Sequence, residues 1–287
     1  MGHVGLQVAD LERAVAFAVG VLGLRETERA GDAVYLSCND RHHELMLIAG
    51  EAVALHHLAL EVPDAATLAA LRARLDGAGW PLLDEPVEAG VQDALRCVGP
   101  AGVVFELFHG MATVAHDHAP DAGAAVVRPH RFEHATLTVA DLDAMEAFFV
   151  DMLGFARSDR VPGAISWLRC SDRHHDVNLM AGPDAFHHMA WEVDGLADVG
   201  RLADALAGRE GGAGLLWGPG RHAPGNVLFG YFADDSGVIN ELCAEVDTVG
   251  ADYAPRTWPQ APSTANRWGP QAPAGFLDRG VALRRAT

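Results

Sequence analysis

The spacing of apolar and polar residues predicts an alternation of short strands and helices. In the segment 134–139 (HATLTV) polar and apolar side chains alternate, which is typical of a half-buried strand. Asp141 follows at a helix N-cap position, and the apolar residues of 142–153 recur with helical spacing. Two further strands are predicted at 166–170 and 175–180, on either side of a polar turn.

The same order of elements then starts again. A strand is predicted at 188–193 and a helix near 196–206. The segments 226–233 and 238–246 are rich in aromatic and β-branched residues, and the turn sequence ADDSG joins them, so they are predicted to form a hairpin. This part of the chain therefore contains two successive strand–helix–strand–strand–strand units.

An internal repeat extends this organisation to the whole chain. The segment HVGLQVADLERAVAFAVGVLGL, which begins at His3, matches HATLTVADLDAMEAFFVDMLGF, which begins at His134. Three more blocks match in the same order: NDRHHELMLIAG with SDRHHDVNLMAG, LHHLALEV with FHHMAWEV, and GVVFELF with GVINELC. Four matches at nearly constant separation are not expected by chance, so the chain contains two copies of one module.

The composition along the chain indicates where these modules end. We expect the first module at 1–112 and the second at 130–248. Residues 113–129 are rich in Ala, Pro and Gly and are predicted to form a linker. The tail, 249–287, is rich in Pro but also contains large aromatic residues, which predicts an extended segment packed on the body. The expected anchors are Trp258, Trp268 and Phe276.

The overall charge restricts the classes of partner. The 287 residues include 21 Lys and Arg against 39 Asp and Glu, a formal net charge of −18. Such a charge repels phosphate backbones and anionic lipid surfaces, so we expect neither nucleic acid nor a membrane as a partner. The N-terminus has no leader pattern and no long apolar run, and the four Cys are far apart, which predicts reduced thiols in a cytoplasmic protein.

Three residues of the second module form a candidate metal site. His134 and His188 are predicted to open two strands, and Glu241 lies within a third. Two neutral imidazoles and one carboxylate, with other positions left open, are the ligand set of non-haem Fe(II). Each histidine taken alone would more often be an ordinary core residue, but the repeat favours a site because the first module has the same three residue types. The equivalents are His3, His57 and Glu106.

Only the second module has the full set of additional acid–base groups around these residues. His175 is predicted on a strand, His222 in a loop, and Tyr231 on the strand that precedes Glu241. The corresponding positions of the first module hold His43, Val87 and Arg96. This asymmetry is expected of an active copy beside a structural one. The His, His and Glu of the first module either bind a second metal or are remnants of duplication, and the asymmetry favours remnants.

The segment GRHAPGNVLFGYFADDSGVINE, residues 220–241, carries a resemblance to a known family. It is similar to the signature of two-module extradiol ring-cleaving dioxygenases of the vicinal oxygen chelate superfamily, such as catechol 2,3-dioxygenases and dihydroxybiphenyl 1,2-dioxygenases. The resemblance covers about 1–248, and two positions depart from it: Gly230 and Asp235 stand where the family favours a large apolar residue and Pro. The resemblance implies an α+β fold of two tandem modules, each with paired βαβββ units in a cupped, partly open mixed β-barrel.

The resemblance also implies an activity and roles for the candidate residues. His134, His188 and Glu241 would hold Fe(II), or less often Mn(II), and the substrates would be a catechol and O₂. His175 would be the general acid and base, and His222 would hydrogen-bond dioxygen or a substrate oxygen. Tyr231 would donate a hydrogen bond to a substrate hydroxyl or deprotonate it. The resemblance therefore implies a site of six residues, which are His134, His188, Glu241, His175, His222 and Tyr231. The product would be a ring-opened semialdehyde or keto acid, cut beside the two hydroxyls, in aromatic-compound catabolism. We also expect a homo-oligomer.

Two other functions on the same fold stay open at this point. One is a metal-dependent lyase, isomerase or thiol transferase of the glyoxalase type, which would not require the trio His175, His222 and Tyr231. The other is a metal-free binding protein of the bleomycin-resistance kind. A further choice concerns register, because His174 and His187 directly precede two of the proposed residues and neighbouring strand residues face opposite sides. The alternation favours His175 and His188.

Overall fold

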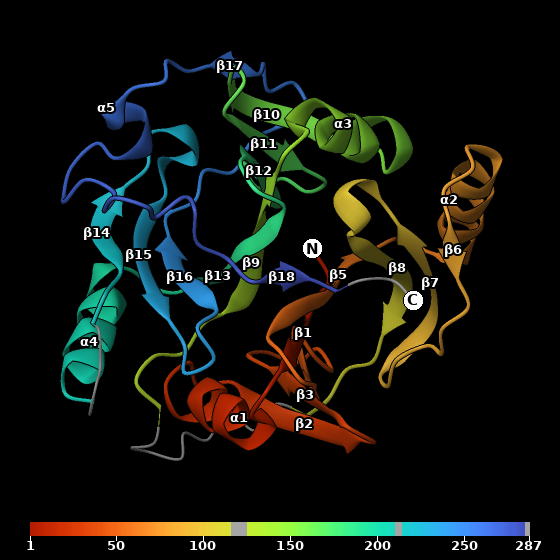
Figure 1. The fold of residues 1–287 in the computed structure, drawn as a ribbon, viewed down its shortest axis with the longest axis horizontal. Coiled ribbons are helices and arrows are strands. Elements are labelled where there is room, and N and C mark those ends of the chain that lie inside the picture. Colours follow the sequence, from red (N-terminus) through yellow and green to blue (C-terminus); the bar gives the residue numbers. More distant parts are fainter. Residues whose placement is uncertain (116–124, 210–213, 285–287) are drawn as a thin grey trace.

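The chain folds into two mixed β-sheets, each covered by helices (Figure 1). The structure, a computed structural model, describes residues 1–115, 125–209 and 214–284. The predicted linker, 113–129, therefore lies partly outside the described residues. The first half of the chain forms β1 (Val4–Val8), α1 (Leu11–Gly20), β2 (Arg25–Ala30), β3 (Ala33–Ser37), β4 (Leu45–Ala49), β5 (Ala54–Glu61), α2 (Ala65–Gly77), β6 (Leu82–Leu83), β7 (Val91–Val98), a 3₁₀ turn (Pro100–Gly102) and β8 (Val104–Met111).

The second half repeats this order of elements. It forms β9 (Arg131–Val139), α3 (Leu142–Ala147), a π-helical turn (Phe148–Met152), β10 (Ala156–Val161), β11 (Ile165–Arg169), β12 (Val177–Ala181), β13 (Ala185–Glu192), α4 (Leu196–Ala207), β14 (Trp217–Arg221), a 3₁₀ turn (Pro224–Asn226), β15 (Leu228–Ala233) and β16 (Ile239–Ala244). Both halves thus consist of two βαβββ units, as predicted, and the α+β fold with two tandem modules is confirmed.

Each sheet joins its two βαβββ units through their first strands. In the second sheet the strand order is β14-β15-β16-β13-β9-β12-β11-β10-β17, where β17 (Arg256–Thr257) comes from the C-terminal tail. Strands β9 and β13 are antiparallel at the junction. Strands β12 and β16 lie parallel to β9 and β13 on the outer sides of this pair. The first sheet has the corresponding order around β1 and β5. Residues on β9, β13 and β16 therefore lie side by side in the middle of a sheet.

The helices follow the predicted signals, with one departure. Asp141 caps α3 by accepting a hydrogen bond from the Ala144 amide at 2.9 Å. The single helix predicted over 142–153 divides into α3 and the π-helical turn, which buries Phe148 and Phe149. Both rings contact Phe105 of the first module, with ring centroids 5.2 and 5.3 Å apart. The wider turn thus places two aromatic rings in the contact between the modules.

The C-terminal tail crosses from the second sheet to the first. Its elements are β17 (Arg256–Thr257), which pairs with β10, α5 (Pro262–Ala265), and β18 (Ala282–Leu283), which pairs with β5. In Figure 1 the blue tail passes over the second module and ends beside β5. Trp258 donates to Asp159 and Phe276 is buried, but Trp268 is 43 % exposed and is not an anchor. The tail thus lies against both sheets, and its side chains can form one wall of a cavity whose other wall is the second sheet.

No helix in the described part of the chain is both long and apolar enough to cross a bilayer.

Candidate metal centre

Three neighbouring strands bring His134, His188 and Glu241 together. The Nε2 atoms of both histidines lie 3.2 Å from Oε2 of Glu241. All three side chains are buried, and their ligand atoms lie within 4.8 Å of one another. The prediction that these histidines open strands is wrong. His134 lies inside β9, which begins at Arg131, and His188 lies inside β13, which begins at Ala185 and pairs with β9 on one side and β16 on the other.

The atoms of this cluster fit a divalent cation. Nε2 of His134 and both carboxylate oxygens of Glu241 are buried without a hydrogen-bond partner among the described residues. No Lys or Arg side chain in the described ranges forms an ion pair with Glu241. Burying a carboxylate is costly unless a positive charge lies beside it. In the metal-free protein protonated His134 supplies that charge, and a divalent cation at the converging atoms would replace the proton. Two imidazoles and a carboxylate are ligands for Fe(II), Mn(II) or Zn(II).

A second layer of hydrogen bonds orients His134. Its Nδ1 lies 2.7 Å from Oε2 of Glu133, whose other oxygen accepts a bond from Arg173 at 3.1 Å. The Nδ1 atom therefore carries a proton, and Nε2 points toward Glu241. Burial opposes the charged form of His134, but the hydrogen bond to Glu133 and the ion pair with Glu241 outweigh it and raise its pKa to about 9 without a metal. A carboxylate behind a ligand histidine is the usual support in metal sites.

His188 is held from both ends of its ring. Its Nδ1 lies 2.7 Å from Nδ1 of His187, and its Nε2 lies 2.9 Å from Oγ1 of Thr136. Burial lowers the pKa of His188 to about 3, so the ring is neutral at pH 7. Burial alone would raise the pKa of Glu241, but the nearby His134 and His188 rings hold it well below its usual range. At pH 7 without a metal, His188 is therefore neutral, Glu241 is ionised and His134 is protonated. A metal at Nε2 of His134 would displace one proton from that ring.

His175 lies against the same cluster from the next strand connection. Its ring centroid is 4.5 Å from that of His134. The prediction that His175 lies on a strand is wrong, because β12 begins at Val177. The carboxylate of Asp176 accepts the amide hydrogens of Cys170 and Ser171 and closes a turn before the strand starts. Burial, and then the neighbouring His134, holds the pKa of His175 well below its usual range, so it is a neutral base.

His222 and Tyr231 complete the rim of the cluster. His222 follows β14 directly, since part of the predicted loop pairs with β15 as a strand. Its Nδ1 donates to the carbonyl of Ala265, so its Nε2, 3.1 Å from the Tyr231 hydroxyl, accepts. Tyr231 lies opposite Glu241 in the β15–β16 pairing. Burial, then Glu241, raises the pKa of Tyr231 well above its usual value, so the phenol keeps its proton.

The histidines that precede His175 and His188 have other partners. His174 lies with Nε2 3.1 Å from Oδ2 of Asp159, on the side of the tail residue Tyr253. His187 lies with Nε2 3.0 Å from the carbonyl oxygen of Phe276. His175 and His188 are thus the members of each pair that face His134.

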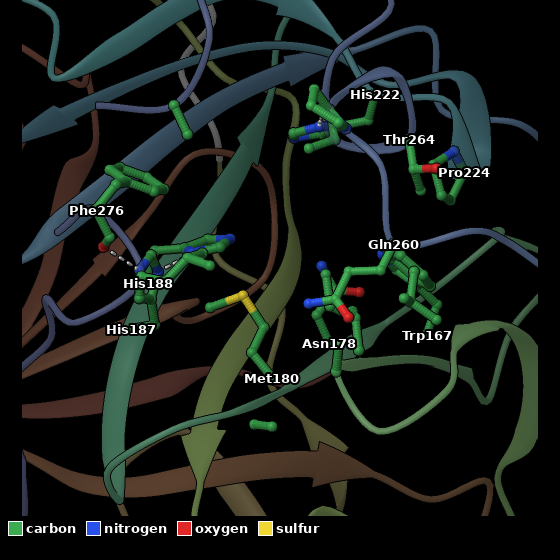
Figure 2. A pocket seen from close by; sticks show the side chains of 18 of the residues that line it. Trp167, Asn178, Met180, His187, His188, His222, Pro224, Gln260, Thr264 and Phe276 are labelled. Atoms are coloured by element: carbon green, nitrogen blue, oxygen red, sulfur yellow. Dashed lines mark hydrogen bonds between the residues drawn. The ribbon is translucent and has the colours of Figure 1, made fainter. Parts of the chain in front are cut away.

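A cavity of about 470 Å³ opens onto these residues. Figure 2 shows His188, His187 and Phe276 on one side of it and Trp167 and Gln260 on the other. Residues 259–277 of the tail form much of the wall, which the sequence did not reveal because they follow Glu241 and lie outside both repeats. Its larger apolar and aromatic lining residues are Val161, Ile165, Trp167, Met180, Trp217, Phe276 and Leu277.

The two positions that depart from the family pattern lie away from this cavity. Gly230 alternates with Tyr231 and faces α4, where an added Cβ would lie 2.6 Å from Cγ1 of Val199. Asp235 lies in the hairpin turn and accepts hydrogen bonds from Arg209. Both departures therefore concern packing around the hairpin, not the candidate centre.

The first module has a related cluster with different electrostatics. The Nε2 atoms of His3 and His57 are 2.9 Å apart. Arg96, opposite Glu106 as Tyr231 is opposite Glu241, binds Glu106 at 2.7 and 2.8 Å. Arg96 also binds Glu88, a buried carboxylate that the repeat did not reveal because its counterpart segment differs in length. Among the described residues this cluster thus contains its own cation.

Comparison with known proteins agrees with this architecture. The Manganese-dependent 2,3-dihydroxybiphenyl 1,2-dioxygenase of Geobacillus genomosp. 3 is 26 % identical over 258 residues, which are 81 % of this chain and 80 % of that protein. The Iron-dependent extradiol dioxygenase of Rhodococcus jostii (strain RHA1) is 28 % identical, over 94 % of this chain and 95 % of that protein.

The solved structure of a Mn(II)-bound glyoxalase from Novosphingobium aromaticivorans superposes with a TM-score of 0.85 and 28 % identity. It covers 99 % of this chain, which in turn matches 93 % of that one. The family described as the Glyoxalase/Bleomycin resistance protein/Dioxygenase superfamily matches residues 1–107 and 131–242. The match takes in both sheets and the strands that carry both clusters, and the chain therefore belongs to this superfamily.

Proposed function

We propose that this protein cleaves the ring of a catechol beside its two hydroxyls, with O₂ as co-substrate and Fe(II), or alternatively Mn(II), as cofactor. The observation that carries the proposal is the convergence of His134, His188 and Glu241 at the floor of a cavity whose rim holds three further acid–base groups. A relative named as an iron-dependent extradiol dioxygenase, over almost the full length of both chains, supports the reaction class.

The division of labour follows from the donor atoms. A divalent metal held by the two Nε2 atoms and the Glu241 carboxylate would supply Lewis acidity to two adjacent catechol oxygens and a path for electrons from the ring to O₂. Both oxygen atoms of O₂ enter the product, so the protein itself has to move only protons and hold the ring.

Proton transfer falls to the neutral groups at the rim. His175 is neutral and buried beside His134, so it can accept a proton from a catechol hydroxyl and return it later. The Tyr231 hydroxyl donates to Nε2 of His222 at 3.1 Å, and the same hydroxyl can turn to a substrate oxygen. The low pKa of His222, caused by burial, keeps it an acceptor at neutral pH.

The walls of the cavity favour an uncharged, apolar ring substituent. No Lys or Arg side chain lines the described part of the cavity. Away from the histidines its side-chain polarity comes from uncharged groups such as Asn178, Gln260 and Thr264. A carboxylate substituent would lose its hydration there without a cation to pair with. We therefore propose alkyl- or aryl-substituted catechols as the substrate class.

Protein purified without oxygen and loaded with Fe(II) or Mn(II) tests the proposal. We expect O₂ uptake and a yellow ring-fission product with alkyl and aryl catechols, and much lower kcat/KM with catechols that carry a carboxylate. Glu241→Gln should lose both the metal and turnover, whereas the matched change Glu106→Gln in the first module should retain both.

Two results would contradict the proposal. Metal-loaded protein that consumes no O₂ with any catechol but isomerises thiol adducts would favour a glyoxalase-type reaction, which the similarity to the Mn(II)-bound glyoxalase supports as second candidate. Equal loss of turnover in Glu241→Gln and Glu106→Gln would place the reaction in both modules.

We also propose a cytoplasmic, homo-oligomeric protein, and the four free cysteines fit a reducing compartment.

A further inference from the structure

Each module has a pair of adjacent histidines whose rings meet through their Nδ1 atoms. The pair is His56 and His57 on β5, with 2.8 Å between the Nδ1 atoms, and His187 and His188 on β13, with 2.7 Å. All four rings are buried, and burial favours the neutral form of an imidazole. A neutral imidazole has one N–H and one bare nitrogen, so one ring donates to the other.

In the second module a carbonyl decides which ring donates. Nε2 of His187 lies 3.0 Å from the backbone oxygen of Phe276, which can only accept a hydrogen bond. The proton of His187 is therefore on Nε2, and its Nδ1 is bare. Nδ1 of His188 must then donate, which leaves Nε2 of His188 without a proton, 2.9 Å from the Thr136 hydroxyl and 3.2 Å from Oε2 of Glu241. A metal could take this lone pair in place of the hydroxyl.

In the first module a guanidinium group fixes which ring donates, and here the first histidine of the pair donates to the second. Nη1 of Arg284 lies 2.6 Å from Nε2 of His56, and a guanidinium can only donate. The proton of His56 is therefore on Nδ1, which donates to Nδ1 of His57. The proton of His57 is then on Nε2, which faces Nε2 of His3 at 2.9 Å and Oε1 of Glu88 at 3.4 Å. An N–H at this position offers no lone pair to a metal.

Both deciding groups belong to one short stretch of the tail. Val281 pairs with Phe186, the residue before His187, and Leu283 pairs with Leu55, the residue before His56. The Arg284 amide donates to the Leu55 carbonyl at 2.8 Å. Glu85 accepts from Nη2 of Arg284 at 2.6 Å and holds the guanidinium against His56. The tail is therefore fixed at equivalent points of the two modules but presents opposite hydrogen-bonding groups.

We propose that the C-terminal tail sets the two histidine pairs in opposite tautomers, so that the second module can bind a divalent metal and the first cannot, with Arg284 as the positioning residue of the first module. Geometry alone would admit a metal at His3, His57, Glu88 and Glu106, whose ligand atoms also lie within 4.8 Å of one another. Because Nε2 of His57 carries a proton, it has no lone pair for a metal, and it donates that proton to the lone pair on Nε2 of His3. Arg96 supplies the positive charge that Glu88 and Glu106 need. The inference rests on the proposed metal ligands but not on the proposed reaction.

Nitrogen NMR of the histidine rings in metal-free protein tests the tautomers directly. We expect His57 with its proton on Nε2 and His188 with its proton on Nδ1. Arg284→Met should shift His57 toward the Nδ1–H form and leave His188 unchanged. Arg284→Lys keeps a group that only donates and should preserve the wild-type tautomer, which a purely structural role of the arginine would not predict. His57 found in the Nδ1–H form in wild-type protein would overturn the proposal.

Metal stoichiometry, measured after anaerobic loading with Co(II), supplies the second readout. Wild-type protein should bind one Co(II) per chain. The double variant Arg96→Tyr/Arg284→Met, which removes both cations, should bind two, and Arg96→Tyr/Arg284→Lys should remain at one. Two Co(II) in wild-type protein, or one in the folded double variant after His57 has changed tautomer, would overturn the proposal. Because neither readout involves a catechol, both hold whether or not ring cleavage is found.

Discussion

At the scale of residues, the two modules differ most at the position opposite the shared glutamate. Tyr231 faces Glu241 with a neutral phenol, whereas Arg96 faces Glu106 with a cation. A buried carboxylate needs a positive partner, so the first module satisfies Glu106 within the protein and the second leaves Glu241 to a metal. His175 can exchange a proton with a substrate bound at that metal. Its counterpart His43 has no such role, because Arg96 takes the place of a metal beside Glu106.

The first prediction concerns that difference. His175→Gln keeps a polar side chain of similar reach but cannot take up a proton, so turnover should fall by about 10²–10⁴-fold, the usual contribution of general acid–base catalysis. Metal content and catechol affinity should stay near the wild-type values, because His175 lies beside His134 and is not one of the three ligands. Single-turnover kinetics together with metal analysis measure these quantities.

The control for this prediction is His43→Gln, the same change at the equivalent position of the first module. It should retain turnover. Metal loss in His175→Gln would make His175 a ligand, and unchanged turnover would assign the proton to His222 or Tyr231.

At the scale of elements, the sequence pattern predicted the features that depend on residues close together in the chain. Alternation and the repeat predicted the two βαβββ units of each module and the cap at Asp141, because these depend on contacts within a few residues. They did not predict that β12 starts only at Val177, since the Asp176 side chain binds backbone amides across a turn. Glu88, the tail residues of the cavity wall and the Arg284 contact were also missed, because only the folded chain brings them to the sheets.

The second prediction concerns the packing of α4 on β15. Gly230→Ala places a Cβ 2.6 Å from Cγ1 of Val199, a buried β-branched side chain that cannot move aside freely. We expect the free energy of unfolding to fall by about 1–3 kcal/mol, as for other overpacked cores. Denaturant titration measures the change, and Val199→Ala in the same chain should recover part of it.

Gly200, on the exposed face of the same helix, gives the matched control. An added Cβ there would meet no atom within 4 Å, so Gly200→Ala should stabilise the helix by about 0.5–1 kcal/mol. Equal effects of Gly230→Ala and Gly200→Ala would show that close packing between α4 and β15 does not determine the result.

At the scale of the whole molecule, the modules are joined by aromatic packing and by the tail. Phe148 and Phe149 contact Phe105 across the modules, and β18 adds the end of the chain to the first sheet. A loss of stability in one module should therefore appear in the unfolding of both. Buried neutral histidines make that stability depend on pH, because their pKa is lower in the folded chain, so the unfolded chain binds protons at these positions at a higher pH.

The last prediction follows from the histidines of the first module. Burial, followed by the neighbouring His3, lowers the pKa of His43 to about 3, and burial, followed by Arg284, lowers that of His56 to about 4. Between pH 6.5 and 4 the unfolded chain binds protons at both positions and the folded chain does not, so stability should fall as the pH falls. Each histidine should contribute about 1.4 kcal/mol per pH unit. In His43→Gln, measured with chelator present, the slope of unfolding free energy against pH should be smaller by that amount below pH 6 and unchanged above pH 7. The same slope in variant and wild type would mean that His43 takes up a proton in the folded protein, which would place a positive charge beside His3 and require a different account of how the first module balances Glu88.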